Sequence, residues 1–324
     1  MKIALCCTWE SLVSRFIQNV AVCCLLVACL TLLAADAHAA TLKVNCGTTG
    51  ALSTINGALK ILDPKRPNTL IVSGACKENL SIQGFDGLTL TAKPGASISD
   101  ASGGSSIVVF ISDSNRVTLE GFKVNGGSSG IFCADFSTCR FKNNTIQGVT
   151  GFGGVSVIDS KASFEGDVIQ DNSGDGLLAQ SSTLSLDGVT VQRNLNAGVD
   201  LMGGSTLDLR NSNVNGNGAA AEASGVRIAG HSTAELTSNS ITGNHSDGVR
   251  IFQASAAQFD GGNVITGNGA PGAGVEDLSF ADFAPGNVIT GNASPFDVAC
   301  LPQFSATRGA LTNIGGGNTN CTEP

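Results

Sequence analysis

The chain of 324 residues contains 42 glycines, carries charge on only 14% of its residues and has a formal net charge of −8. So many glycines disfavour a helical bundle, because each one destabilises a helix interior by about 1 kcal/mol. A hydrophobic content of 42% argues against disorder. The negative net charge argues against binding to nucleic acid, which requires clustered Lys and Arg side chains.

The first 39 residues have the features of a secretory signal peptide. Lys2 and Arg15 precede an uncharged stretch over residues 16–35, and Ala37-His38-Ala39 has the small-x-small pattern of a cleavage site. The sequence thus predicts cleavage after Ala39 and a secreted or periplasmic protein. No apolar stretch of comparable length follows, so no transmembrane segment is expected after cleavage. Two alternatives are a retained membrane anchor and a lipid anchor on Cys29, which ends the lipoprotein-like run Leu26-Val27-Ala28-Cys29.

The cysteines that remain after cleavage are even in number, which suits an oxidising compartment. They form sequence-local couples, and this proximity predicts three disulfides. A metal site is the alternative, but these cysteines form no C-x-x-C motif. The expected pairs are Cys46 with Cys76, Cys133 with Cys139, and Cys300 with Cys321.

A repeat occupies the second half of the chain. Each unit ends in Asn, and the next begins at a Gly followed by an aliphatic residue. The final asparagines are 22, 23, 27, 24 and 24 residues apart. They are Asn172, Asn194, Asn217, Asn244, Asn268 and Asn292, and the restarts include Gly176-Leu177, Gly198-Val199, Gly225-Val226, Gly248-Val249 and Gly274-Val275.

Within each unit, apolar residues alternate with polar ones, which is the period of a strand with one buried face. No Pro occurs between Gly95 and Gly267, as expected where strands pair on both sides. A leucine-rich repeat has a similar period, but these units favour Val and Ile and have no room for a helix. A left-handed hexapeptide helix would show a six-residue period. The pattern therefore predicts an all-β fold, a right-handed parallel β-helix.

The N-x-x-x-G-V steps at residues 194–199 and 244–249 carry a family resemblance. The chain resembles right-handed β-helix repeat proteins of the pectin-lyase-like superfamily over nearly all of its mature length. The resemblance implies the architecture but no particular activity, because these families include lyases, hydrolases, epimerases and proteins with no known reaction.

Both ends of the stack are expected to be capped within one domain, residues 40–324. Leu52, Ile55, Leu59 and Leu62 have helical spacing, and Pro64 would end such a helix. This short amphipathic helix would cover the open N-terminal end, as in relatives. We expect an N-terminal cap over residues 40–68, coils over 69–292 and an irregular C-terminal cap over 293–324.

The regular asparagines are best explained as a structural ladder, in which each amide bonds backbone groups of neighbouring coils. Ligand binding by these amides is the alternative. On the strand after each Gly, the residue next to the inward Val should point outward. That places Asp200, Arg227, Arg250 and Glu276 in one exposed column, with about 4.8 Å between coils.

Polysaccharide lyases of this fold use acidic residues and Arg on one exposed sheet to bind calcium and abstract a proton. The resemblance therefore makes Asp200, Arg227 and Arg250 candidate catalytic residues. The alternative is a solvated row of opposite charges. His245 and Asp247, in the turn before Arg250, are weaker candidates for acid–base chemistry.

Residues 171–176 resemble a calcium loop, with Asp171 and Asp175 as weak candidate ligands, but Ser182 stands where such a loop carries Glu. No other cofactor is expected. The mature chain lacks Trp and Tyr, the usual partners of sugar rings. Phe132 and Phe252 are expected to face outward, and Phe252 lies two positions after Arg250.

Two functional hypotheses follow. The first is an exported, disulfide-braced, non-catalytic scaffold that binds a polysaccharide or another cell-surface component. The alternative is a polysaccharide lyase or glycoside hydrolase acting on an acidic glycan. A passive calcium-binding solenoid is a third, weaker possibility.

Overall fold

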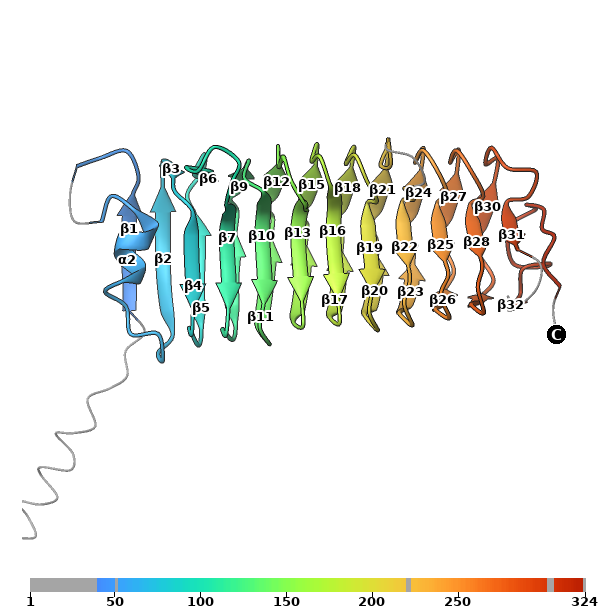
Figure 1. The fold of residues 1–324 in the computed structure, drawn as a ribbon, viewed down its shortest axis with the longest axis horizontal. Coiled ribbons are helices and arrows are strands. Elements are labelled where there is room, and N and C mark those ends of the chain that lie inside the picture. Colours follow the sequence, from blue (N-terminus) through green and yellow to red (C-terminus); the bar gives the residue numbers. More distant parts are fainter. Residues whose placement is uncertain (1–39, 50–51, 220–222, 302–305, 323–324) are drawn as a thin grey trace, which may run out of the picture. The chain divides into compact units, whose positions relative to one another are not determined.

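The computed structural model describes residues 40–49, 52–219, 223–301 and 306–322. The predicted signal peptide, residues 1–39, and the lipidation candidate Cys29 lie outside the described residues. From Ala40 onward the chain winds into coils that stack in chain order, from blue to red in Figure 1. Within the part described, no helix combines the length and hydropathy needed to cross a membrane.

Each coil contributes strands to parallel sheets, here called sheets A, B and C. Twelve of the described strands form sheet A: β1 (Ala40–Asn45), β2 (Asn68–Ser73), β5 (Leu88–Ala92), β8 (Val117–Glu120), β11 (Thr138–Lys142), β14 (Lys161–Glu165), β17 (Thr183–Asp187), β20 (Thr206–Arg210), β23 (Thr233–Thr237), β26 (Ala256–Phe259), β29 (Phe280–Phe283) and β32 (Ala306–Arg308).

Sheets B and C have ten described strands each. Sheet B comprises β3 (Ala75–Lys77), β6 (Ser97–Ser99), β9 (Lys123–Asn125), β12 (Thr145–Gln147), β15 (Val168–Gln170), β18 (Thr190–Gln192), β21 (Asn213–Asn215), β24 (Ser240–Thr242), β27 (Val264–Thr266) and β30 (Val288–Thr290). Sheet C comprises β4 (Leu80–Gln83), β7 (Ile107–Ser112), β10 (Ser129–Ala134), β13 (Gly153–Ile158), β16 (Asp175–Gln180), β19 (Val199–Met202), β22 (Val226–Ile228), β25 (Val249–Ile251), β28 (Ala273–Val275) and β31 (Val298–Cys300).

The chain passes from sheet C to sheet A to sheet B in each coil, so every strand pairs with its equivalents one coil away. Val199 thus pairs with Val226, and Val226 with Val249. This is the predicted all-β, right-handed parallel β-helix, and the sequence-based fold class is confirmed.

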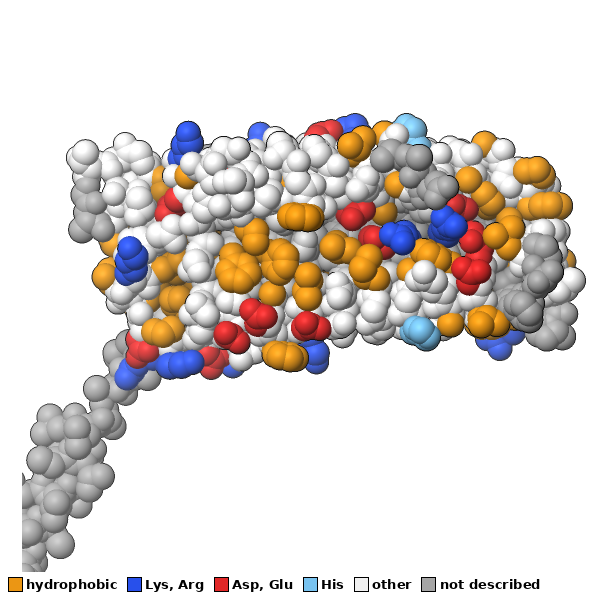
Figure 2. Space-filling model, viewed as in Figure 1, with side chains coloured by type: hydrophobic (Ala, Val, Ile, Leu, Met, Phe, Trp, Pro, Cys, Tyr) orange, Lys and Arg blue, Asp and Glu red, His pale blue; other side chains and the backbone are white. Residues whose placement is uncertain are grey.

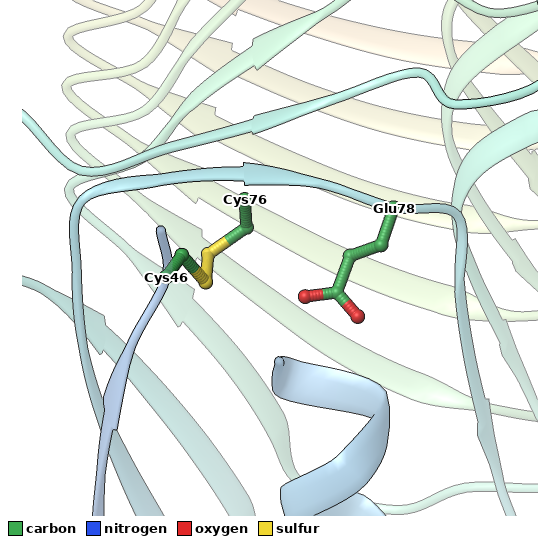
Figure 3. Close-up of side chains that lie close together, drawn as sticks. All are labelled: Cys46, Cys76 and Glu78. Carbon is green, nitrogen blue, oxygen red and sulfur yellow. A yellow bond between two sulfur atoms is a disulfide. The ribbon is translucent and has the colours of Figure 1, made fainter. Parts of the chain in front are cut away.

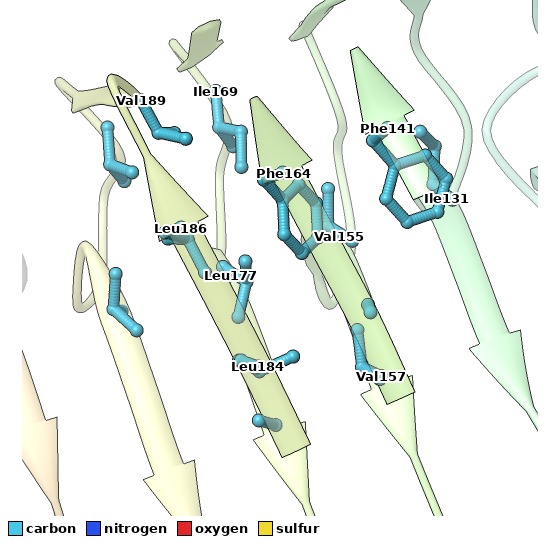
Figure 4. Close-up of a cluster of buried hydrophobic side chains, with 14 of the residues drawn as sticks. Ile131, Phe141, Val155, Val157, Phe164, Ile169, Leu177, Leu184, Leu186 and Val189 are labelled. Atoms are coloured by element: carbon cyan, nitrogen blue, oxygen red, sulfur yellow. The ribbon is translucent and has the colours of Figure 1, made fainter. Parts of the chain in front are cut away.

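The core consists of like side chains stacked between successive coils, as the close-up in Figure 4 shows. Phe141 lies over Phe164 with ring centroids 4.9 Å apart, and Phe259 stacks on Phe283 at 4.5 Å. All four rings are almost fully buried. Burial of apolar surface contributes about 25 cal/mol per Å², so these columns drive each coil to stack on the next.

The repeated asparagines form a hydrogen-bonded ladder at one corner of the coils. The side-chain carbonyl of Asn217 accepts hydrogen bonds from the backbone N–H of Asn194 (3.0 Å) and from its Nδ2 (3.0 Å). The Nδ2 of Asn217 in turn donates to the oxygen of Asn244, 3.1 Å away. The same contacts run from Asn172 to Asn292. Each amide therefore satisfies buried groups that water does not reach.

The Gly at each restart leaves space for this ladder. A Cβ on Gly176 would lie 2.7 Å from Nδ2 of Asn194 and 2.5 Å from the carbonyl oxygen of Gly198. In the later coil the equivalent position is Gly272, where a Cβ would lie 2.6 Å from Nδ2 of Asn292. The restart predicted at Gly274 is therefore wrong, and the true restart lies two residues earlier.

A second ladder at another corner consists of serines and was not predicted. Each hydroxyl accepts a hydrogen bond from the backbone N–H of the serine one coil earlier, as between Ser182 and Ser205 (3.1 Å). Serine is also common in exposed turns, so these positions do not stand out in the sequence. The ladder runs through Ser114, Ser137, Ser160, Ser182, Ser205, Ser232, Ser255 and Ser279.

The N-terminal end is covered by helix α2 (Ile55–Leu59), which is shorter than the spacing of leucines suggested. The hydroxyl of Thr54 caps it by accepting the N–H of Gly57 at 3.0 Å. Glu78, on the coil beneath, accepts the N–H groups of Ile55 (2.7 Å) and Asn56 (3.0 Å). In Figure 3 this carboxylate points at the start of the helix, beside the Cys46–Cys76 disulfide.

The stack extends beyond the coil limits expected from the sequence. Strand β1, within the expected N-terminal cap, pairs with β2, and β31 and β32 extend sheets C and A after Asn292. These outer strands lack the Asn and Gly markers on which the limits were based. Among the described residues, three disulfides join the pairs expected from the sequence: Cys46–Cys76, Cys133–Cys139 and Cys300–Cys321.

Candidate functional site

The three main candidates lie side by side on sheet C. In the strand register Asp200 pairs with Arg227, and Arg227 pairs with Arg250. Their neighbours in the same strands, such as Val226 and Ile228, are fully buried, so alternation turns the charged side chains outward. Glu276 was expected next in this column, but Gly274 occupies that register position. The reason is that this coil restarts at Gly272 and not at Gly274, the restart predicted from the sequence.

The outward side chains form a groove with a volume of about 430 Å³. In the view of Figure 2, basic and acidic side chains gather on this face, over strands β19, β22 and β25. The structure therefore brings the dispersed charges of three coils to one place. The described residues that line the groove are Asp175, Asn196, Ala197, Asp200, Ala223, Arg227, Arg250 and Phe252.

The two arginines each bind a carboxylate and lie near the same aromatic ring. Arg227 Nη1 donates to Asp200 Oδ2 at 2.9 Å. Arg250 donates to both oxygens of Glu276, from Nε at 3.2 Å and from Nη2 at 3.1 Å, although Glu276 lies outside the register column. The guanidinium carbons lie 5.1 Å and 5.0 Å from the ring centroid of Phe252. Cation–π contact and ion pairing together fix both arginines.

Phe252 was expected to face outward, and the structure explains why it is only 8% exposed. Both guanidinium groups lie within cation–π distance of its ring, so they shield it from water. The ring therefore acts as a support for Arg227 and Arg250, whose side chains line the groove.

Asp200 combines burial with an incomplete set of partners. Its side chain is almost fully buried, and burial raises its carboxyl pKa, while the charge and hydrogen bond of Arg227 oppose this. Its Oδ1 atom has no hydrogen-bond partner among the described residues. A buried carboxylate oxygen without a donor is costly, so the ion pair with Arg227 has to compensate for this cost.

Asp175 lies on the adjacent coil and accepts the N–H of Ala197 at 3.0 Å. Burial, followed by the nearby charge of Asp200, raises the pKa of Asp175 to about 7. At neutral pH the groove therefore holds one carboxyl group near its titration midpoint beside an Asp–Arg ion pair. From the sequence, Asp175 was expected only as a calcium ligand. Its position near Asp200 depends on the register of the coils, which the sequence does not show.

The weaker acid–base candidates do not contact each other in the described structure. Nδ1 of His245 lies 3.1 Å from the carbonyl oxygen of Asn217. Asp247 is buried and accepts the hydroxyl of Ser246 at 3.2 Å. Burial raises the pKa of Asp247, and the charge of Arg250 opposes the shift. Asp247 thus belongs with the surroundings of Arg250, whereas His245 lies in the exposed turn.

The two calcium candidates have different partners. Both oxygens of Asp171 accept hydrogen bonds from Arg193, at 2.8 and 2.9 Å, and the Arg193 hydrogen bond lowers the pKa of Asp171. Asp175 instead lines the groove. The Arg193 ion pair makes Asp171 a poor cation ligand.

Among the described residues, one group has the side-chain types and spacing of metal ligands: Cys46, Cys76 and Glu78 (Figure 3). The two sulfur atoms form the Cys46–Cys76 disulfide, and the Glu78 carboxylate accepts hydrogen bonds from two N–H groups of helix α2. This group has a structural role.

Comparisons with known proteins agree with this architecture. The family model "Right handed beta helix region" matches residues 106–224. The A-module of a mannuronan C-5 epimerase from Azotobacter vinelandii superposes with a TM-score of 0.64 and 16% identity, over 85% of this chain and 84% of that one. The protein therefore has the pectate-lyase-like β-helix fold.

Other similar structures share this fold at low identity. A pectate lyase superposes with a TM-score of 0.56 and 12% identity, over 89% of this chain and 82% of its own. A tailspike protein from an Escherichia coli O157:H7 bacteriophage gives 0.60 and 15%, over 82% of this chain and 42% of its own. No curated protein matches the sequence. At these identities the similarity establishes the fold, and the function rests on the groove itself.

Proposed function

We propose that this is an exported β-helix protein that binds an acidic polysaccharide in the sheet C groove and does not cleave it. The observation that carries this proposal is the pair of guanidinium groups that line the groove within about 5 Å of the Phe252 ring centroid. Planar guanidinium groups bind carboxylates well, and here their orientation is fixed before a ligand arrives.

The groove also offers acceptors for sugar hydroxyls. The side chains of Asp175 and Asn196 line the groove. A uronate unit carries both a carboxylate and hydroxyl donors, so it complements both kinds of group. The named activities of two similar structures, a pectate lyase and a mannuronan epimerase, concern acidic polysaccharides and support the choice of ligand class.

The ion pairs favour binding over catalysis. Proton abstraction by Arg needs a neutral guanidine, whereas Asp200 and Glu276 stabilise the charged forms of Arg227 and Arg250. The candidate base Asp200 is itself bound to Arg227.

Binding can be tested by calorimetry with polygalacturonate and alginate, with dextran as an uncharged control. We expect both uronans to bind, with affinity falling as salt increases. The double variant Arg227→Gln/Arg250→Gln should lower affinity at least about tenfold. Arg140→Gln is the matched control, because Arg140 forms an exposed ion pair with Glu165 on sheet A. The proposal is wrong if neither uronan binds, or if the double variant binds as well as the natural protein.

One observation favours the alternative, an enzyme acting on an acidic glycan. Asp175, with a pKa of about 7, lies beside Asp200, and a protonated acid next to a carboxylate is the arrangement that acid–base catalysis requires. Incubation with the same uronans, followed by absorbance of unsaturated ends and by reducing-end assay, tests this. Product formation that is lost in Asp175→Asn would replace the binding proposal with a catalytic one.

A further inference from the structure

Two aromatic rings lie on the outward column that contains the arginine pair. Phe110 pairs with Phe132 in the strand register, and their ring centroids are 5.9 Å apart with the planes tilted by 50°. Both side chains remain partly exposed. The mature chain lacks Trp and Tyr, and the fold thus builds an aromatic surface from phenylalanines that are 22 residues apart.

The register connects this surface to the groove without interruption. From Phe132 the column passes through Ser156 and Leu178 and reaches Asp200. Ser156 is buried and Leu178 is partly exposed, so one accessible apolar side chain of this column lies between the phenylalanines and the charged groove. In Figure 2, hydrophobic side chains gather on this same face over strands β7 and β10, next to the charged side chains over β19 and β22.

The distances suit one extended ligand. Coils are about 4.8 Å apart, so the three steps from Phe132 to Asp200 span about 14 Å and the four steps to Arg227 span about 19 Å. A polysaccharide chain that lies along the stack would advance by roughly one ring per coil. One end of such a chain can contact the phenylalanines while another unit is bound by the arginines.

We propose that Phe110 and Phe132 form a second subsite, which binds the apolar face of a sugar ring in the same acidic glycan. This inference rests on the proposed function. The C–H groups on one face of a pyranose present an apolar surface, and an aromatic ring is a rigid, apolar partner for it. The subsite selects chain length, because only a glycan that spans both the phenylalanine pair and the arginine groove makes both sets of contacts.

The test compares a long oligogalacturonate with digalacturonate by calorimetry. The long oligomer should bind the natural protein more tightly, and Phe132→Ala should lower its affinity about tenfold while leaving digalacturonate binding unchanged. Phe136→Ala is the matched control, because Phe136 belongs to the same coil, is 84% exposed and lies in the turn after β10. Phe132→Leu provides a variant with a similar apolar volume and no ring, and should give an intermediate loss.

The outcomes separate the subsite from the proposed function. If both oligomers bind but Phe132→Ala weakens neither, or weakens both equally, the subsite is wrong and uronate binding stands. If the natural protein binds neither oligomer, both proposals fall. Saturation-transfer NMR gives a second readout: ring C–H protons of the long oligomer should receive saturation from the protein, and this transfer should fall in Phe132→Ala.

Discussion

Arg227 donates to one oxygen of Asp200 at 2.9 Å, while the other oxygen of that buried carboxylate has no hydrogen-bond partner among the described residues. The ion pair is therefore held in place, but the carboxylate accepts fewer hydrogen bonds than its two oxygens allow. Burial that raises the pKa of Asp200 and a charged partner that lowers it act against each other.

Asp175 should make stability depend on pH. Its pKa of about 7 in the folded protein is above the ordinary value of 3.8. The folded state thus binds this proton more tightly than the unfolded state, so its contribution is fully present below about pH 4 and is lost as pH rises towards about 7. Asp175→Asn should remove this loss, so the variant should be more stable than the natural protein at pH 8, by up to a few kcal/mol.

Urea unfolding at pH 4 and pH 8 measures this difference, with Asp135→Asn, an exposed turn residue, as the control. Equal changes in unfolding free energy between the two pH values for Asp175→Asn and the natural protein would contradict the prediction.

Asn217 should be among the most sensitive positions of the ladder. In Asn217→Ala, the backbone N–H and the Nδ2 of Asn194 would both lose their acceptor in the buried interior. We expect a loss of about 3 kcal/mol in the free energy of unfolding. Asn213→Ala, an exposed outward position on strand β21 of the same coil, should change it by less than about 1 kcal/mol. Denaturant unfolding compares the two variants, and similar losses would exclude a special role for the ladder.

The disulfides should stabilise the fold according to the length of chain that they close. Cys46 and Cys76 are 30 residues apart, and Cys133 and Cys139 are 6 apart. On chain entropy alone, loss of the first bond should cost about 3.5 kcal/mol and loss of the second about 2.5 kcal/mol. Thermal melting of the two double Cys→Ser variants tests the order. A greater loss from the Cys133–Cys139 pair would show that local strain or packing outweighs chain entropy.

Calcium should leave the melting temperature unchanged. Arg193 binds both oxygens of Asp171, and Asp175 has a raised pKa that disfavours the ionised form a cation needs. A ligand that binds only the folded state raises the melting temperature with concentration. Melting with excess calcium, and with magnesium as the comparison ion, is the measurement. A saturable increase specific to calcium, lost in Asp175→Asn, would restore the calcium site.

Sequence patterns were sufficient for the features that repeat in every coil. Each coil must satisfy the buried hydrogen-bonding groups at the same corner and fill the same core. The Asn column, the Gly restarts and the alternation of Val and Ile recur for this reason. For this reason the fold and the outward direction of Asp200, Arg227 and Arg250 could be predicted. The serine ladder escaped notice because serine is also common in exposed turns.

The amino-acid sequence by itself determined the β-helix, since its period and its buried polar residues are local properties of each coil. Tertiary structure alone decided which side chains meet across coils, because coils of unequal length can be aligned only through their hydrogen-bonded register. That register placed Gly274 beside Arg250, left Glu276 to reach back to it, set Asp175 next to Asp200 and joined Phe110 to Phe132. Burial, which shifts the two aspartate pKa values, likewise exists only once the coils have stacked.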